Sequence, residues 1–315
     1  MKTTRIFFND YEPLTFKFQQ NKFDFIVDEI PSKQFSNRGN FLVLQIKKEL
    51  LSTWDLLNII SKKLEIDEHL IGYAGLKDKN ATTTQFISIP LNRSRDFKEL
   101  NSKNIKVLKT FKHHERLKIG DLYGNRFKIA LKNVKNSELP FIYQTLSQIQ
   151  KNGMPNYFGY QRFGKEYNFD QSRNIVYGDE VIKDKKLEKF LRLAYQSYFF
   201  NGWLANRIGL SRKEGLKKLQ PLDGDIYSRE NKKIVTGLLP GRNIIRAKAD
   251  ARVIEEQFDD TYIHEKGFRR DAIIIVEDIK NKYIEDKEIL ELEFTLPKSS
   301  YATVLIENLA NKNFA

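Results

Sequence analysis

The sequence predicts an α+β fold, with a mixed, largely antiparallel sheet and helices on one face. Short segments of alternating polarity recur between residues 14 and 132, as in half-buried strands. Residues 138–150 and 185–208 instead have apolar side chains at helical spacing. A chain of 315 residues with 40% hydrophobic residues can also enclose a sizeable core. Together these features favour strands and helices in one mixed architecture.

Six strands are expected in the first half of the chain. Residues 14–20 and 23–30 are predicted to be the first two and to lie side by side. A helix capped by Ser52 or Thr53 follows the third strand, because a hydroxyl can accept a hydrogen bond from the first helical turn. Pro90 ends the fourth, since proline has no N–H for the sheet. The other four strands are predicted at residues 41–47, 83–89, 104–110 and 125–132.

The second half begins with a break. Gly153 and Pro155 end the helix that is expected over residues 138–150. A long helix is predicted over residues 185–208 and a turn-rich segment over residues 221–242. The chain is predicted to finish with a strand near residues 273–276, an alternating strand over 290–297, and a helix through Asn308 that is capped by Ser299 or Ser300.

One turn, residues 72–85, places Asp78 between Lys77 and Lys79. Its two glycines permit backbone angles that other residues resist. The two lysines are expected to keep the Asp78 carboxylate ionised and to attract a polyanion. A solvated surface turn has the same local pattern, so a chemical role for Asp78 depends on other parts of the chain.

The charge balance points to a phosphate-rich partner. Lys and Arg number 54 against 41 Asp and Glu, a formal charge of +13, although basic proteins without a nucleic-acid role also exist. Aromatic residues make up 12% of the chain, and exposed rings can stack on unpaired RNA bases. The absence of cysteine excludes disulfides, thiolate nucleophiles and cysteine-ligated metals. No apolar run has the length of a signal peptide or a membrane span, so a cytoplasmic protein is expected.

Residues 101–120 contain six basic side chains and one acidic side chain. This segment is either a phosphate-binding surface or a solvated strand edge that lysines protect from aggregation. His113 and His114 are adjacent, and neighbouring strand residues point to opposite faces, so a metal site is not expected there.

Four blocks of sequence, in this order, resemble the TruD family of tRNA pseudouridine synthases. They are residues 72–85, 122–127, 155–164 and 294–303, with weaker matches at 235–241 and 267–270. The resemblance implies a discontinuous catalytic domain, residues 1–153 and 276–315, and an inserted α/β TRUD domain, residues 154–275. A simple pair of N- and C-terminal domains remains an alternative, because alternation patterns do not distinguish the two organisations.

The resemblance also implies a set of site residues. Asp78 falls on the family's catalytic aspartate, and Asn125 and Phe127 match its active-site Asn and Phe. Tyr301 stands where the family usually has Phe, and the returning C-terminal segment would bring it to Asp78. Asn125 would orient a carboxylate or the uracil edge, and Phe127 would pack beneath the base.

A basic residue that many TruD sequences carry is missing here. Gln19 occupies its position, so either Lys17, which shares a strand face with Gln19, or Lys22 would supply the active-site cation. Lys77 and Lys79 are the expected phosphate contacts.

The resemblance implies an isomerase that converts uridine, at position 13 of tRNA, to pseudouridine after flipping the base out of the stack. No metal or other cofactor is expected, and the sequence leaves open whether Asp78 acts as a nucleophile or as a base. A monomer is expected because no heptad pattern is present. The alternatives are a non-catalytic tRNA-binding or chaperone protein and a metal-dependent phosphodiesterase. The latter needs clustered ligands, whereas Asp78 is the only carboxylate in its motif.

Overall fold

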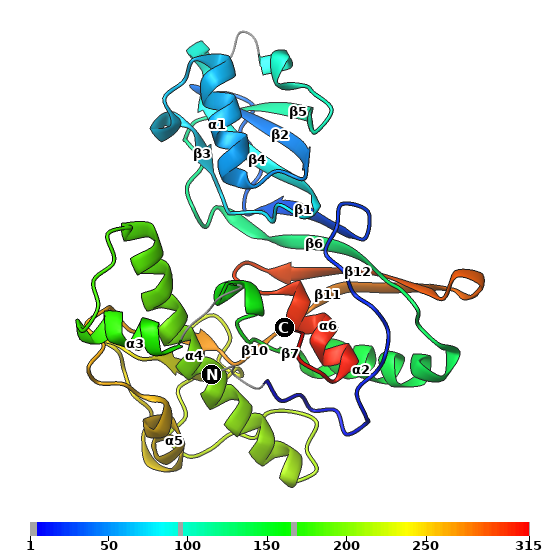
Figure 1. The fold of residues 1–315 in the computed structure, drawn as a ribbon, viewed down its shortest axis with the longest axis vertical. Coiled ribbons are helices and arrows are strands. Elements are labelled where there is room, and N and C mark those ends of the chain that lie inside the picture. Colours follow the sequence, from blue (N-terminus) through cyan, green and yellow to red (C-terminus); the bar gives the residue numbers. More distant parts are fainter. Residues whose placement is uncertain (1–4, 94–96, 165–168, 315) are drawn as a thin grey trace. The chain divides into compact units, whose positions relative to one another are not determined.

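The computed structural model describes residues 5–93, 97–164 and 169–314. The chain divides into two compact units, whose elements are labelled in Figure 1. We call residues Met1–Leu14, Glu138–Ile275 and Ser300–Ala315 the helical unit, and residues Thr15–Ser137 and Val276–Ser299 the sheet unit.

The sheet unit is built on an eight-stranded sheet in the order β11-β12-β6-β1-β4-β2-β5, with β3 paired to β4. Only the β1–β4 pairing is parallel among these strands, so the predicted mixed, largely antiparallel sheet is confirmed. Their bounds are β1 Phe25–Pro31, β2 Phe41–Glu49, β3 Gly72–Tyr73, β4 Thr82–Pro90, β5 Ile105–His113, β6 Leu122–Leu131, β11 Glu277–Ile284 and β12 Ile289–Pro297.

Helix α1 (Thr53–Leu64) packs against one face of this sheet. Leu56 and Ile60 of the helix join Leu44 and Ile46 of β2 in a fully buried cluster. The helix begins at this point because Ser52 caps it, as predicted. The Ser52 hydroxyl accepts a hydrogen bond from the backbone N–H of Asp55, the third helical residue, and the Asp55 carboxylate accepts one from the Ser52 N–H.

The helical unit contains longer helices and two short two-stranded sheets, β10 with β7 and β8 with β9. Gly153 ends α2 with a positive φ of 79°, which confirms the predicted break. None of the helices in the described part of the chain combines the length and apolarity that a membrane crossing needs. The bounds are α2 Leu139–Asn152, β7 Met154–Pro155, α3 Phe169–Tyr177, α4 Lys185–Lys213, β8 Thr236–Leu239, α5 Ala249–Glu255, β9 Phe268–Asp271, β10 Ile273–Ile274 and α6 Ala302–Ala310.

The predicted strand at residues 14–20 is wrong. Only Lys17 pairs with the sheet unit's backbone, through two hydrogen bonds with Lys132 of 2.7 and 2.9 Å. Alternation of polarity signals a segment with one buried side, and Leu14 and Phe16 are indeed buried. It does not guarantee pairing in a sheet: within the described part of this segment only Lys17 forms a β-bridge, and the Leu14 N–H instead donates a hydrogen bond of 2.9 Å to the Ala310 carbonyl oxygen.

The C-terminal helix also differs from expectation at its start. Tyr301 is the N-cap of α6 and makes no capping hydrogen bond through its side chain, so the predicted serine cap is wrong. β12 lies beside β6 in the sheet unit, whereas α6 belongs to the helical unit. The boundaries of the predicted catalytic domain and of the predicted insertion differ from those of the two compact units. The predicted domain organisation therefore stays a prediction.

Candidate active site

The turn between β3 and β4 carries Asp78 and is held by contacts from α1 and β2. The Thr53 hydroxyl, at the first position of α1, accepts a hydrogen bond of 2.9 Å from the backbone N–H of Lys77. The ammonium group of Lys48, near the end of β2, donates a hydrogen bond of 3.3 Å to the carbonyl oxygen of Asp78. Two neighbouring elements therefore fix the backbone on both sides of the Lys77–Asp78 peptide bond.

Close packing, and not an unusual backbone angle, accounts for Gly72, whereas a Cβ on Gly75 would make only ordinary contacts. Neither Gly72 nor Gly75 has a positive φ, contrary to the expectation from the sequence. A Cβ on Gly72 would lie 2.3 Å from the Ser88 hydroxyl and 2.5 Å from the Leu117 carbonyl oxygen. Gly72 is therefore required because β3 lies against these atoms.

Lys77 points into the sheet unit and not toward solvent. Its ammonium group forms an ion pair with the Glu29 carboxylate, and the two side chains are only 4% and 1% exposed. Glu29 also accepts a hydrogen bond of 3.1 Å from the backbone N–H of Phe86, across the region where β1 and β4 no longer pair. Lys77 thus presents no surface to a phosphate in this arrangement.

Lys79, on the other side of Asp78, has the exposure that a phosphate contact requires. Its side chain is 64% exposed and lies 3.7 Å from the carboxylate of Asp55, itself 42% exposed. An exposed pair of this kind contributes little to stability, so an incoming phosphate can displace it at small cost.

Lys48 was not identified from the sequence as a site residue. It is fully buried and forms no ion pair within the described residues; its ammonium group donates to the carbonyl oxygens of Leu51 and Asp78. The signal was present in β2, where Leu42, Leu44 and Ile46 alternate inward and Lys48 takes the next inward position. A lysine in the apolar phase of a strand is unusual enough to indicate a specific role.

The electrostatic environment of Asp78 is set by burial and by two lysines. Asp78 is exposed on its turn, but the protein atoms packed around it desolvate the carboxyl and raise its pKa above the usual value, and Lys48 and then Lys77 oppose that rise. Burial lowers the pKa of the Lys48 ammonium to about 8, and Asp78 opposes this shift. The carboxylate and the buried lysine therefore support each other's charge.

The pairing register places Phe127 on the same sheet face as Lys48. Lys48 is paired with Thr83, Thr83 with Val27, and Val27 with Phe127, and directly paired residues share a face. The Phe127 ring stacks on Phe294 of β12 with a centroid distance of 5.5 Å. Phe127 is buried, so it does not form an open aromatic platform at this face.

The next row on this face carries Asn125, which is paired with Glu29. The Oδ1 atom of Asn125 is buried and accepts no hydrogen bond from the residues that the structure describes. The Thr83 hydroxyl and the Gln85 Nε2 donor, on two residues of β4 in the 72–85 block, are also buried without a hydrogen-bond partner among the described residues. Buried polar atoms without partners are rare, so this face is suited to a polar ligand or ordered water.

Neither predicted candidate for the active-site cation contacts Asp78. Lys17 is exposed, and its backbone forms hydrogen bonds with Lys132, the residue after β6. The ammonium group of Lys22 lies 3.2 Å from the Glu49 carboxylate. Among the described residues, the cations that influence Asp78 are Lys48 and Lys77.

Tyr301 belongs to the helical unit, so its predicted place beside Asp78 stays a prediction. Within that unit its ring makes an edge contact with Phe158, at a centroid distance of 6.1 Å. The Arg270 guanidinium lies 4.0 Å from the centre of the Phe158 ring and donates a 2.6 Å hydrogen bond to the Asn156 side chain. Residues of the 155–164, 267–270 and 294–303 blocks thus meet around Phe158.

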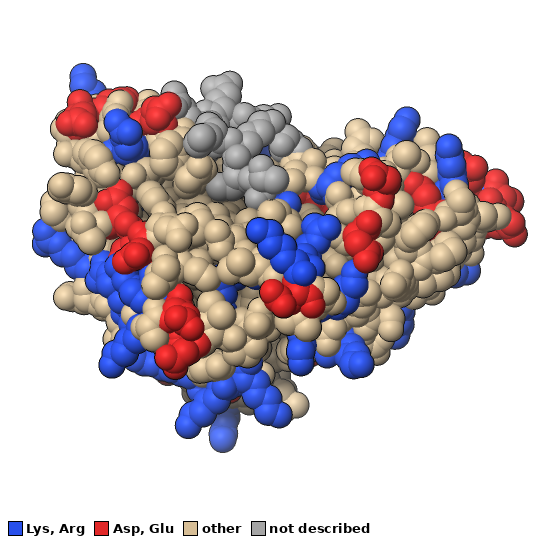
Figure 2. All heavy atoms as spheres, turned by 90° about the horizontal axis from the view of Figure 1, so that it is seen from below, with Lys and Arg blue, Asp and Glu red and all other residues tan. Residues whose placement is uncertain are grey.

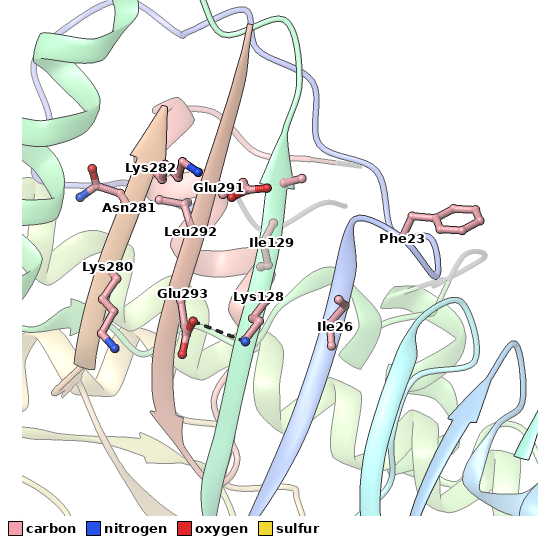
Figure 3. A pocket seen from close by; sticks show the side chains of 11 residues that line it. Phe23, Ile26, Lys128, Ile129, Lys280, Asn281, Lys282, Glu291, Leu292 and Glu293 are labelled. Carbon is pink, nitrogen blue, oxygen red and sulfur yellow. Dashed lines mark ion pairs between the residues drawn. The ribbon is translucent and has the colours of Figure 1, made fainter. Parts of the chain in front are cut away.

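A groove of about 350 Å³ lies on the opposite face of the sheet and is a separate feature. Lys128, which follows Phe127 in β6, points into it and forms an ion pair of 3.6 Å with Glu293 of β12 (Figure 3). Lys280 and Lys282 of β11 lie beside these strands in the same view. Because both signs of charge line the groove, it has no preference for a polyanion.

Comparison with known proteins agrees with these motifs. Residues 3–182 match the family model described as tRNA pseudouridine synthase D (TruD). The proteins named tRNA pseudouridine synthase D from Wolinella succinogenes and Nitratiruptor sp. are 38% and 37% identical to this chain, with 98% of each chain covered in both cases.

The fold agrees as well. A crystal structure described as a putative tRNA pseudouridine synthase D from Methanosarcina mazei superposes with a TM-score of 0.68 and 23% identity, over 99% of this chain and 97% of that one. The sequence matches span most of the chain and include the turn that carries Asp78. This chain therefore belongs to the tRNA pseudouridine synthase D (TruD) family.

Proposed function

We propose that this protein is a tRNA pseudouridine synthase that isomerises uridine, at position 13 of tRNA, in the cytoplasm and without a cofactor. Membership of the family supports the reaction class. The observation that carries the proposal is the position of Asp78, on a turn held by Thr53 and Lys48 and beside two buried lysines.

The reaction breaks the bond between ribose C1′ and uracil N1, turns the base, and joins C5 to C1′. The hydrogen at C5 leaves as a proton, and N1 gains a proton, so the composition of the nucleotide does not change. Asp78 has to be ionised, whether it attacks the nucleotide as a nucleophile or removes a ribose proton as a base. The charges of Lys48 and Lys77 favour that ionised form against the effect of burial.

Recognition requires the target uridine to leave the RNA stack, because a stacked base cannot reach a turn on the protein surface. Asn125 has an unpartnered Oδ1 that can accept a hydrogen bond from N3–H of uracil. Phe127 is proposed to pack beneath the base, and Tyr301 is proposed to contact it. Lys79 is the proposed phosphate contact because its side chain is exposed.

The test combines a tRNA labelled with tritium at uracil C5 with mapping of pseudouridine by position, in buffer that contains EDTA. The wild type is expected to release tritium and to modify position 13, and Asp78→Asn is expected to do neither while it still binds tRNA. Asp67→Asn, an exposed aspartate without a capping hydrogen bond, is the matched control and should retain activity.

Two results would contradict the proposal. Modification by Asp78→Asn at the wild-type rate would remove Asp78 from the chemistry. If the wild type binds tRNA and releases no tritium, the chain is a tRNA-binding protein without this activity.

A further inference from the structure

Lys48 is the strongest positive influence on Asp78 within the described residues. Its side chain projects from β2 into the interior of the sheet unit and has no exposed surface. Its pairing partners are Thr83 of β4 and Ile105 of β5, neither of which is charged. The ammonium group therefore has no charged partner on these strands, and it donates hydrogen bonds to the carbonyl oxygens of Leu51 and of Asp78.

We propose that Lys48 is the positioning cation of the active site, which holds the Asp78 backbone through its carbonyl oxygen and keeps the Asp78 carboxylate ionised. This inference rests on the proposed function of Asp78. It gives Lys48 the role that the sequence had suggested for Lys17 or Lys22, neither of which has a contact with Asp78 among the described residues.

Stability alone does not account for Lys48. A methionine of similar length would fill the same buried space without the cost of desolvating a charge. The lowered pKa of the Lys48 ammonium shows that burial works against its charge. Lys48 keeps this unfavourable charge next to Asp78, a carboxylate that needs a cation. A role in the reaction explains its presence better than packing does.

The charged groups that face Lys48 set the expected pH dependence. Asp78 and Asp55 favour its charged form, and Lys77 opposes it. Because burial lowers the pKa of Lys48 to about 8, the ammonium loses its proton at mildly alkaline pH. Wild-type kcat should therefore fall as the pH rises through this region, and it should fall again at acid pH when Asp78 is protonated.

Three variants separate the roles of charge and packing. Lys48→Met removes the charge and both hydrogen bonds but keeps the volume. We expect kcat for tritium release to fall on the order of 100-fold, as for a misplaced catalytic group. The Kd for tRNA should not rise, because the Lys48 side chain is inside the protein. The melting temperature should not fall, because a charge is unfavourable there. The acid limb of the profile should move to higher pH, because Lys48 no longer lowers the pKa of Asp78.

Lys48→Arg keeps a charge that does not titrate in this range, so the alkaline fall in kcat should disappear. Lys47→Met is the matched control. Lys47 is the preceding residue of β2, points to the opposite face and lies 3.8 Å from Glu49. It should leave both limbs of the pH profile unchanged.

An unchanged kcat and unchanged pH limbs in Lys48→Met would overturn the inference. A wild-type kcat that stays level as the pH rises through about 8 would also overturn the inference. This measurement does not depend on the folding of any variant. A fall in kcat that is matched by a fall in melting temperature, with no shift of either limb, would assign Lys48 a structural role only. In each case, activity of the wild type and its loss in Asp78→Asn would leave the proposed function intact.

Discussion

Lys77 and Lys79 are two positions apart in the chain but lie in opposite environments. From the sequence both are expected to have the same role, because a Lys-Asp-Lys triplet predicts two cations around a carboxylate. The structure buries Lys77 against Glu29 and exposes Lys79 beside Asp55. The difference arises because β1 and β4 separate after their three paired positions, and Glu29 occupies the gap between them. A strand pairing that ends early cannot be read from the triplet.

The buried pair should therefore matter for stability. Glu29→Gln keeps an acceptor for the Phe86 N–H but leaves the Lys77 charge unpaired. The variant should lose about 3 to 5 kcal/mol in free energy of unfolding, measured with urea. Adding Lys77→Met should restore most of the loss, because no buried charge remains. Lys79→Gln, at the exposed pair, should change stability by about 1 kcal/mol or less. Equal losses at the buried and exposed pairs would contradict this assignment.

Sequence reasoning selected Asp78 and Asn125 as candidate site residues through motifs, but it did not select Lys48. Motif resemblance transfers a position only where the family pattern is matched, and Gln19 breaks the pattern. Lys48 can be identified from its inward position in the alternation of β2. Its link to the site is evident only once the pairing of β2 with β4, of β4 with β1 and of β1 with β6 places it on the same face as Phe127. That face depends on long-range pairing, which alternation does not reveal.

At the scale of elements, α1 and the turn that carries Asp78 form one connected structure. The Thr53 hydroxyl accepts from the Lys77 N–H and donates a 3.1 Å hydrogen bond to the Gln85 side chain of β4. The start of α1 thus links the turn to the strand that follows it. A shift of the helix start would move Asp78 relative to the sheet.

Thr53→Val tests this connection because it keeps the shape and removes the hydroxyl. The Lys77 N–H then has no acceptor, at a cost of about 1 to 3 kcal/mol, and kcat for tritium release should fall. Thr53→Ser keeps the hydroxyl and should retain most of the activity. Ser52→Ala controls for the helix itself: it removes the cap at a cost of about 1 kcal/mol but spares the contact with the turn. If Ser52→Ala lowers kcat as much as Thr53→Val, the contact has no special role.

Strand β5 contains part of the basic segment, residues 101–120, which was expected to be either a phosphate-binding surface or a protected strand edge. β5 ends the sheet, and the register sets Lys106 opposite Lys47 and Lys109 opposite Gln45, on the face away from α1. These lysines therefore lie on the other face from Lys48 and Phe127. Their position suits the protection of an open strand edge.

The double variant Lys106→Gln and Lys109→Gln should accordingly bind tRNA with a Kd within about twofold of the wild type, since no phosphate contact is lost. Filter binding at fixed salt measures this, and Lys79→Gln is the comparison. A large loss of affinity in the double variant would make β5 part of the RNA-binding surface.

At the scale of the whole molecule, the sequence predicts which side of a strand is buried better than it predicts the order of the strands in the sheet. The apolar phases of β2, β6 and β12 were readable because buried and more exposed positions largely alternate along them, whereas β4 is buried on both faces. Their order in the sheet was not, since β1 lies between β6 and β4 and β12 returns from the end of the chain. The failed strand at residues 14–20 has the same cause, because its alternation carries no information about a partner.

The formal charge of +13 gives the last prediction. Basic and acidic side chains are interspersed on the face in Figure 2, so the excess charge acts through individual phosphate contacts more than through one uniform field. Affinity for tRNA should fall steeply with salt, with a slope of about 0.9 in log K for each phosphate neutralised. Lys79→Gln should reduce that slope by about one unit, while kcat at saturating tRNA stays close to the wild-type value. A slope that does not change in Lys79→Gln would show that Lys79 makes no phosphate contact, and a salt-independent Kd would contradict electrostatic binding altogether.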